Sequence, residues 1–264
     1  MGESSEGSND VSETNYLIVF LDILGYKEKV RKGNVSKEEL LKSTIELVSE
    51  IKSIPDYCKF DDEIIGVRTF SDNFLIYYKL NEELTHRDAS IVFDILDRVC
   101  YTQYCFLGQY KLMIRGGVVI DKMYVNDDIV FGDGLIASYE LENKVAIYPR
   151  IVLDDNTFNE LTKISKLLPS RIDTDFIMPQ DYDGIRYLDY YRFVNPHHNL
   201  DPDNDSMMEL YSKIESIRDT LLSLITEYRD ENLYHCQKLS WIIHLYDDDC
   251  NIFGLRSKKI FPME

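Results

Sequence analysis

Apolar residues recur along the chain with two periods, one typical of strands and one typical of helices. Residues 16–21 (YLIVFL) form a continuous apolar run, which predicts a strand buried on both faces. Residues 36–54 and 88–107 carry apolar positions three and four apart, which predicts two amphipathic helices. Residues 63–79 have the pattern of two strands around a tight turn, and residues 113–120 have that of another strand. The order strand, helix, strand, strand, helix, strand is the βαββαβ pattern of a ferredoxin-like α+β sheet.

The chain continues with shorter elements and ends in helices. Residues 122–131 have the pattern of a short hairpin, and residues 133–143 that of a helix rich in small side chains. Between residues 148 and 194 we expect short strands around one further helix. Apolar spacings of three and four predict two more helices, over residues 207–228 and 234–246.

These patterns divide the chain into three parts. Residues 1–14 are polar and acidic, which predicts a disordered lead-in. Residues 15–195 form the expected α+β domain, which carries the candidate chemistry described below. A loop rich in Pro, Asn and Asp follows, and residues 196–264 are expected to be a helical extension packed on that domain.

Composition excludes several classes of function. The 264 residues contain 47 Asp and Glu against 29 Lys and Arg, a net charge of −18 that argues against nucleic acid as a partner. The five cysteines are an odd number without a C-x-x-C pair, which favours reduced thiols over a disulfide framework or a zinc site. The amino-terminal segment lacks the features of a signal peptide, and the sequence has no apolar run long enough to span a bilayer. We therefore expect a cytoplasmic protein without a membrane partner.

Two aspartates stand where carboxylates can meet. Asp22 directly follows the first apolar run, and Asp72 lies in the turn of the predicted hairpin. The first strand of a βαββαβ sheet lies beside the hairpin strands, so both carboxylates are expected at one edge of the sheet. Hard oxygen ligands of this kind suit Mg²⁺ or Mn²⁺, with substrate phosphates completing the coordination shell. The alternative is local, with Asp22 capping a helix and Asp72 serving as an ordinary turn residue.

The segment after Asp22 is expected to bind an anion. Ile23, Leu24, Gly25 and Tyr26 should turn directly into a helix, so that their backbone N–H groups face a substrate phosphate. These donors would supply a positive potential that an acidic chain otherwise lacks.

An ordered set of motifs resembles the class III nucleotide cyclases. Residues 20–26 (FLDILGY) are similar to the F-x-D-I-x-G-F opening of that family, and residues 70–72 (FSD) to the hairpin with its second metal-binding aspartate. Residues 131–142 (FGDGLIASYELE) occupy the place of the helix that contacts ribose and phosphate. With residues 115–118 (RGGV) and 146–151 (AIYPRI), the set looks most like the bacterial anti-phage pyrimidine cyclases of Pycsar systems.

The resemblance covers roughly residues 15–195 and implies a site with two divalent cations, Mn²⁺ or Mg²⁺. The metal ligands it implies are Asp22, the backbone carbonyl of Ile23, and Asp72. It also implies a homodimer in which each of two composite active sites takes residues from both subunits.

The chain departs from the purine cyclases of this family at two helix positions. Those enzymes carry an Asn and, four residues later, a transition-state Arg where this chain has Ile136 and Glu140. A glutamate cannot stabilise negative charge on the α-phosphoryl oxygens. We expect Arg115, on the strand beside the site, to serve instead, and Ile136 to contact substrate. The alternatives are an ordinary ion pair for Arg115 and loss of activity for the chain.

Two further substitutions favour a pyrimidine base. Arg68 stands where purine cyclases carry a base-reading Lys, and strand alternation predicts that it shares a face with Phe70 and Asp72. A guanidinium only donates hydrogen bonds, which suits the carbonyl oxygens of uracil or cytosine. Ile129 replaces the base-reading acid and so removes an acceptor for the adenine amino group. The alternative for Arg68 is a strand residue that faces solvent.

The expected function is conversion of UTP, or of CTP, to the 3′,5′-cyclic monophosphate and pyrophosphate. UTP is expected ahead of CTP because uracil offers two carbonyl oxygens. The Pycsar resemblance implies that the product is a second messenger of phage defence, read by a separate effector. The alternatives are a purine cyclase and a catalytically inactive, nucleotide-sensing dimer.

Overall fold

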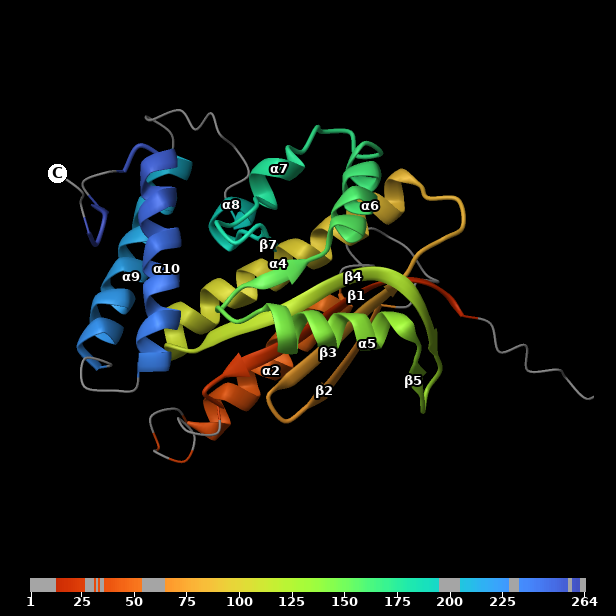
Figure 1. Cartoon of the computed structure of the whole chain (residues 1–264), viewed down its shortest axis with the longest axis horizontal. Helices are drawn as coiled ribbons and strands as arrows, with labels where there is room; N and C mark the ends of the chain where they lie inside the picture. The colour runs from red at the N-terminus through yellow and green to blue at the C-terminus, as the bar shows by residue number, and fades with distance from the viewer. Residues whose placement is uncertain are drawn as a thin grey trace, which may run out of the picture.

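A sheet with four long strands lies at the centre of the computed structural model (Figure 1). These strands are β1 (Thr14–Leu24), β2 (Ile65–Phe70), β3 (Asn73–Lys79) and β4 (Met113–Val125). Their order is β2-β3-β1-β4, and each is antiparallel to its neighbours. This is the strand order of the βαββαβ fold, so the predicted ferredoxin-like α+β class is confirmed. The structure describes residues 13–26, 31, 33, 36–53, 65–194, 205–227, 233–255 and 258–261.

One face of the sheet is covered by the helices α2 (Lys37–Lys52) and α4 (His86–Tyr110). Every second residue of β1, from Leu17 to Ile23, lies on this face and joins the main hydrophobic core. The helix α4 begins at a capping box, in which Thr85 and Asp88 satisfy each other's backbone N–H groups. The helix predicted over residues 88–107 was shorter at both ends. Residues 86–87 and 108–110 lie outside the apolar spacing that defined the prediction.

The opposite face of the sheet is covered by α5 (Asp133–Glu140) and a π-helical segment, η1 (Leu141–Val145). The other residues of β1, including Ile18 and Phe20, lie on this face. Gly117 on β4 allows the close approach, since a Cβ there would lie 2.4 Å from the carbonyl oxygen of Ser138. The predicted hairpin at 122–131 is also present, with β5 (Val130–Phe131) paired to the end of β4.

The sheet is extended by β6 (Ile151–Leu153), parallel to β4, and by β7 (Arg186–Leu188), antiparallel to β6. The remaining helices of the described chain are α6 (Asp155–Ser165), α7 (Thr174–Ile177), α8 (Tyr190–Val194), α9 (Asp205–Glu227) and α10 (Leu233–Ile252). The last two lie side by side (Figure 1) and contribute residues such as Leu221 and Trp241 to the main core. The two predicted carboxyl-terminal helices are thus present and share the core of the α+β part. The boundary between residues 195 and 196 stays a prediction, since residues 195–204 lie outside the described part.

Three local expectations need correction or lie outside the described residues. The strand β1 does not end before Asp22 but continues to Leu24, because β4 pairs with it as far as that residue. The Tyr-Pro-Arg sequence of residues 148–150 suggests the start of a strand, which is wrong, since β6 begins at Ile151. Of the predicted lead-in, residues 1–12 lie outside the described chain and Thr14 belongs to β1. No helix among the described residues is long and apolar enough to cross a bilayer.

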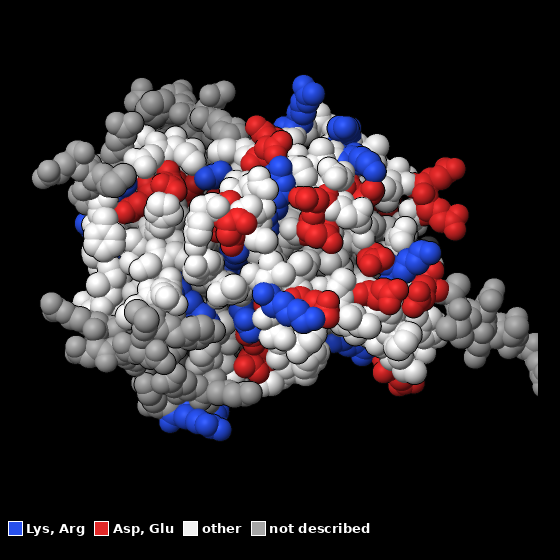
Figure 2. All heavy atoms as spheres, in the orientation of Figure 1, with Lys and Arg blue, Asp and Glu red and all other residues white. Residues whose placement is uncertain are grey.

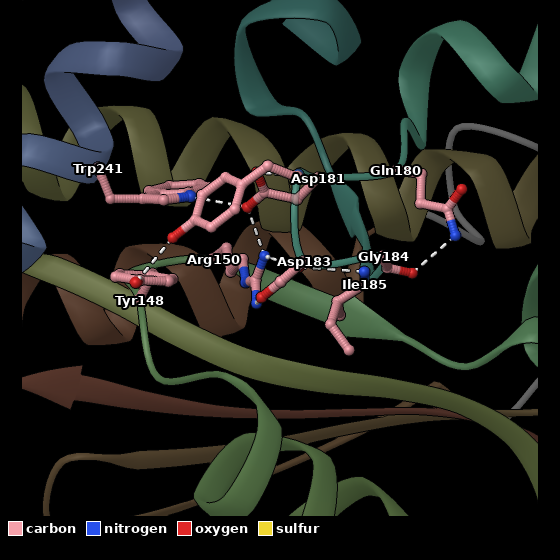
Figure 3. Close-up of polar contacts among 9 residues, drawn as sticks. Tyr148, Arg150, Gln180, Asp181, Asp183, Gly184, Ile185 and Trp241 are labelled. Carbon is pink, nitrogen blue, oxygen red and sulfur yellow. Dashed lines mark hydrogen bonds and ion pairs between the residues drawn. The ribbon is translucent and has the colours of Figure 1, made fainter.

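A buried arginine joins α10 to the loop before β7 (Figure 3). Arg150 is 1% exposed and forms ion pairs with both Asp181 and Asp183. Trp241 on α10 donates from Nε1 to Oδ2 of Asp181 at 2.7 Å. The Trp241 ring also stacks on that of Tyr148, with centroids 6.0 Å apart. A surface role for Arg150, which its charge suggests, is therefore wrong.

A second buried cluster joins α10 to α8. Arg192 lies 3.0 Å from Oδ2 of Asp189 and 2.9 Å from Oδ1 of Asp249, and both carboxyl groups are buried. Burial and the neighbouring Asp189 raise the pKa of Asp249 well above its usual range, and Arg192 opposes this shift. The Oδ2 atoms of both carboxyls accept no hydrogen bond from the described residues, and a proton retained on Asp249 would reduce the repulsion between the two acids.

The raised pKa of Asp249 predicts how stability depends on pH. A carboxyl whose pKa is raised by folding binds its proton more tightly in the folded state, so its contribution is fully present below about pH 3.9. That contribution is lost as the pH rises through the higher folded-state pKa of Asp249. Asp249→Asn cannot ionise, so its free energy of unfolding relative to the wild type should rise between pH 4 and pH 7.

Urea denaturation at several pH values measures this difference. The matched control is Asp248→Asn on the same helix, because the Asp248 side chain is 52% exposed. A constant difference between Asp249→Asn and the wild type across this pH range would contradict the retained proton.

Candidate active site

The segments that carry Asp22 and Asp72 meet at one edge of the sheet. Asp22 on β1 is directly opposite Asn73, the first residue of β3. The backbone N–H of Ile23 donates to the carbonyl oxygen of Asp72 at 3.1 Å. Asp22 and Asp72 are both partly buried. The fold thus brings the backbones of two acids, 50 positions apart along the chain, to neighbouring places, and their joint role as metal ligands stays a prediction.

Asp22 lies on the face of the sheet that α5 covers. Its register partner on β4 is Arg115, whose Nε donates to Oδ2 of Asp22 at 3.1 Å. The other end of the guanidinium, Nη2, lies 2.6 Å from Oε1 of Glu142. Arg115 therefore bridges two carboxylates inside the site. That Arg115 also stabilises negative charge on a phosphoryl group stays a prediction.

Glu142 belongs to the π-helical segment and is 3% exposed. Burial raises its pKa above the usual range for a glutamate, the guanidinium of Arg115 lowers it, and the nearby Asp22 raises it further. Sequence reasoning did not assign this residue a role. The spacing of the helix could have indicated that Glu142 is buried. Glu142 comes four residues after Ser138 and eight after Gly134, on the buried side of the helix, where an apolar side chain is usual.

The segment after Asp22 differs from the prediction. Ile23 and Leu24 are strand residues, so they do not form the first turn of a helix. Gly25 follows with a φ of 73°, a left-handed conformation that favours glycine, and the chain turns there towards Tyr26. The predicted cradle of N–H groups is wrong for Ile23, whose N–H is bound to Asp72. Phosphate contacts by Leu24, Gly25 and Tyr26 stay predictions.

The residues assigned to the base also come together. Arg68 on β2 donates from Nη2 to the carbonyl oxygens of Asn126 and Asp127, at 3.1 and 2.8 Å. These residues form the turn of the β4–β5 hairpin, which also contains the exposed Ile129. Arg68 shares its face of β2 with Phe70, but Asp72 lies in the following turn and so outside the strand, which corrects that expectation.

Apolar side chains surround the acidic edge. Phe20, two residues before Asp22, contacts the ring of Phe70 at a centroid distance of 6.1 Å and that of Tyr139 at 5.7 Å. Phe70, Tyr139 and the predicted substrate contact Ile136 are all exposed. The carboxylates therefore lie beside an exposed apolar surface on the α5 side of the sheet.

The donor set suits a hard divalent cation. Asp22 and Asp72 supply carboxylate oxygens, and the carbonyl of Ile23, the residue after Asp22, is a third oxygen at the same place. Within the described residues no cluster of three or more His, Cys, Asp or Glu is arranged to hold a metal ion. A cation at this edge would thus take its other ligands from water and a substrate, as Mg²⁺ and Mn²⁺ commonly do.

Charged side chains of both signs are mixed on the surface. In the face shown in Figure 2, lysines and arginines are interspersed among aspartates and glutamates and form no continuous basic surface among the described residues.

Comparisons with known proteins find likeness among solved structures. The chain matches no protein-family model and no curated protein sequence. Among solved structures it is similar to the adenylyl cyclase CyaB from P. aeruginosa, at 16% identity and a TM-score of 0.40, over 58% of this chain and 82% of that one. The strand order and the helices on both faces establish the fold: this chain is an α+β protein with a ferredoxin-like βαββαβ core and carboxyl-terminal helices that share it.

Proposed function

We propose that this protein is a metal-dependent nucleotide cyclase that converts a pyrimidine nucleoside triphosphate, UTP or CTP, to its 3′,5′-cyclic monophosphate. The observation that carries the proposal is the meeting of Asp22 and Asp72 at one sheet edge, with the guanidinium of Arg115 alongside. The motif resemblance over residues 15–195 supports the same chemistry.

The reaction is one in-line displacement. The ribose 3′-oxygen attacks the α-phosphorus, the bond from that phosphorus to the oxygen bridging the β-phosphate breaks, and pyrophosphate leaves. The hydroxyl proton passes to solvent. Asp22, Asp72 and the carbonyl of Ile23 would hold Mn²⁺ or Mg²⁺, two ions in each site. When bound, they lower the pKa of the hydroxyl and offset charge on the pyrophosphate.

The chain's own residues orient the substrate. Asp22 and Asp72 would hold the cations that bind the triphosphate end at the sheet edge, and Arg115 supplies further positive charge there. The exposed Ile136 packs against the ribose, and the turn from Leu24 to Tyr26 limits the space around the phosphates. No side-chain general base is required by this scheme.

A pyrimidine is preferred because of the residues at the two base-reading positions. Arg68 can only donate hydrogen bonds, and Ile129 replaces the acidic residue that purine cyclases carry. Arg68 can exchange its two carbonyl partners in the hairpin turn for the carbonyl oxygens of uracil. Ile129 offers an apolar contact and no acceptor for an adenine amino group. Uracil has two carbonyl oxygens and cytosine has one, so UTP is expected to react faster than CTP.

The active form in this proposal is a homodimer. Phe70 and Ile136 are 52% and 56% exposed on the side of the sheet that carries Asp22, and a second copy would cover them. In that arrangement Arg68 and Ile129 of one subunit face the carboxylates of the other. The product would act in the cytoplasm as a second messenger of phage defence, read by a separately encoded effector.

The test is a product assay. Purified protein is incubated with Mn²⁺ and each of ATP, GTP, CTP and UTP, and the products are separated by mass. Cyclic UMP or cyclic CMP supports the proposal. Cyclic AMP or cyclic GMP as the main product overturns the base assignment, and no cyclic product from any of the four overturns the enzymatic function.

A catalytically inactive nucleotide sensor is the second candidate. It is favoured by Glu140, which stands where related enzymes carry an arginine and which pairs with Lys144 on its own helical segment. Nucleotide binding without turnover in the same assay would support it.

A further inference from the structure

Glu142 is a buried acid for which the proposed reaction has no use. It is 3% exposed, and its contact with Nη2 of Arg115 at 2.6 Å is an ion pair without an aligned hydrogen bond. A buried carboxylate requires a nearby positive charge to offset its loss of hydration. Arg115 supplies that charge while it also binds Asp22.

The backbone around Glu142 is built to hold it against β4. A Cβ on Gly117 would lie 2.6 Å from Cβ of Leu141 and 3.1 Å from the nitrogen of Glu142, so the glycine permits this approach. The N–H of Ala146 donates to the carbonyl of Leu141 at 2.8 Å, the five-residue spacing of a π-helix. Such π turns occur mostly at functional sites, because the inserted residue shifts the side chains that follow.

The formal charges of these side chains affect how a divalent cation binds at Asp22. Asp22, Asp72 and Glu142 are three acids and Arg115 is one base, so with all four ionised the formal charge of these side chains sums to −2. Without the charge of Glu142 the sum is −1, and the guanidinium of Arg115 has Asp22 as its remaining charged partner. A guanidinium bound to Asp22 alone competes with a metal ion for the same carboxylate.

We propose that Glu142 is a positioning residue that draws Arg115 partly away from Asp22 and so leaves the Asp22 carboxylate available to a divalent cation. Arg115 donates to Oδ2 of Asp22, which leaves Oδ1 as the oxygen presented to the metal. This inference rests on the proposed metal-dependent function and adds a role for a residue outside the ligand set.

The test measures Mn²⁺ binding to the full chain without nucleotide, from the loss of the electron paramagnetic resonance signal of free Mn²⁺. Glu142→Gln keeps the shape of the side chain and removes its charge, so it should weaken Mn²⁺ binding about tenfold. The matched control is Glu160→Gln, which removes the same charge from an exposed pair with Lys163 on α6. It should leave the affinity unchanged.

A second substitution separates positioning from a structural role. In the double variant Glu142→Gln/Arg115→Met the competing guanidinium is gone, so Mn²⁺ affinity should return to the wild-type value or exceed it. A residue that only supports packing would not be rescued by a second change in the same buried contact. If Glu142→Gln does not fold, Arg115→Met alone answers the question, because it should bind Mn²⁺ at least as tightly as the wild type.

Three results would overturn the inference: Glu142→Gln that binds Mn²⁺ like the wild type, a double variant that stays weak, or Arg115→Met that binds more weakly than the wild type. Wild-type protein that binds no Mn²⁺ would overturn both this inference and the proposed function. Wild-type protein that binds Mn²⁺ but cyclises no nucleotide would overturn the proposed function alone.

Discussion

Replacing Asp22 by Asn is expected to lower the rate of nucleotide cyclisation by at least about a hundredfold, a loss typical of removing one group that stabilises developing charge. The amide keeps the size of the side chain and can still accept a hydrogen bond from Nε of Arg115. It loses the negative charge that a divalent cation requires. Turnover of UTP, followed as cyclic UMP and pyrophosphate, measures the effect.

Two controls make this result specific. Asp72→Asn should cause a loss of similar size, since both acids belong to the same metal site in our proposal. Asp219→Asn, at an exposed position on α9, removes one negative charge elsewhere and should leave turnover unchanged. Circular dichroism and thermal unfolding should show that all three variants fold. Full activity in Asp22→Asn would mean that the metal assignment is wrong.

The strand order could be predicted because each element carries a strong local signal. The continuous apolar run at residues 16–21 suits a strand with helices on both faces, and β1 is the central strand of this kind. The spacings in residues 88–107 mark α4 in the same way. Once the order of elements is known, the βαββαβ rule places β1 between β3 and β4 and so brings Asp22 beside the hairpin turn.

Details that depend on pairing with distant residues could not be predicted. A polar residue in an apolar run resembles a strand end, but β1 continues past Asp22 because Leu24 pairs with Met113. The role of Gly117 likewise depends on the helix that crosses it, and local sequence shows only that a strand contains a glycine.

Buried charges were the least predictable feature. A surface role was expected for Arg150 and no role was assigned to Glu142, since charged residues are rarely buried without a partner. Their partners lie far away in sequence: Arg115 is 27 residues before Glu142, and Asp181 and Asp183 are 31 and 33 residues after Arg150. Such pairs become visible only when the fold is known.

The second large effect is expected at Arg150, whose guanidinium is the only buried positive charge between Asp181 and Asp183 in the described part of the chain (Figure 3). Removing one partner of a buried ion pair leaves the other charges without compensation. This typically lowers the free energy of unfolding by about 3–5 kcal/mol. The side chain of Asp183 is 31% exposed, so part of its charge remains hydrated and the lower end of this range applies.

Arg150→Met is therefore expected to lower the free energy of unfolding by about 3 kcal/mol, measured by urea denaturation at pH 7. The methionine replaces the apolar part of the side chain, so the loss reports the charge and its hydrogen bonds more than a cavity. Adding Asp183→Asn should recover part of this loss, because it removes one of the two unpaired carboxylates. Arg171→Met, at an exposed position, should change the stability by less than about 0.5 kcal/mol. If Arg150→Met were as stable as the wild type, the buried contact would not hold α10 against the loop before β7, and the carboxyl-terminal helices would depend on apolar packing alone.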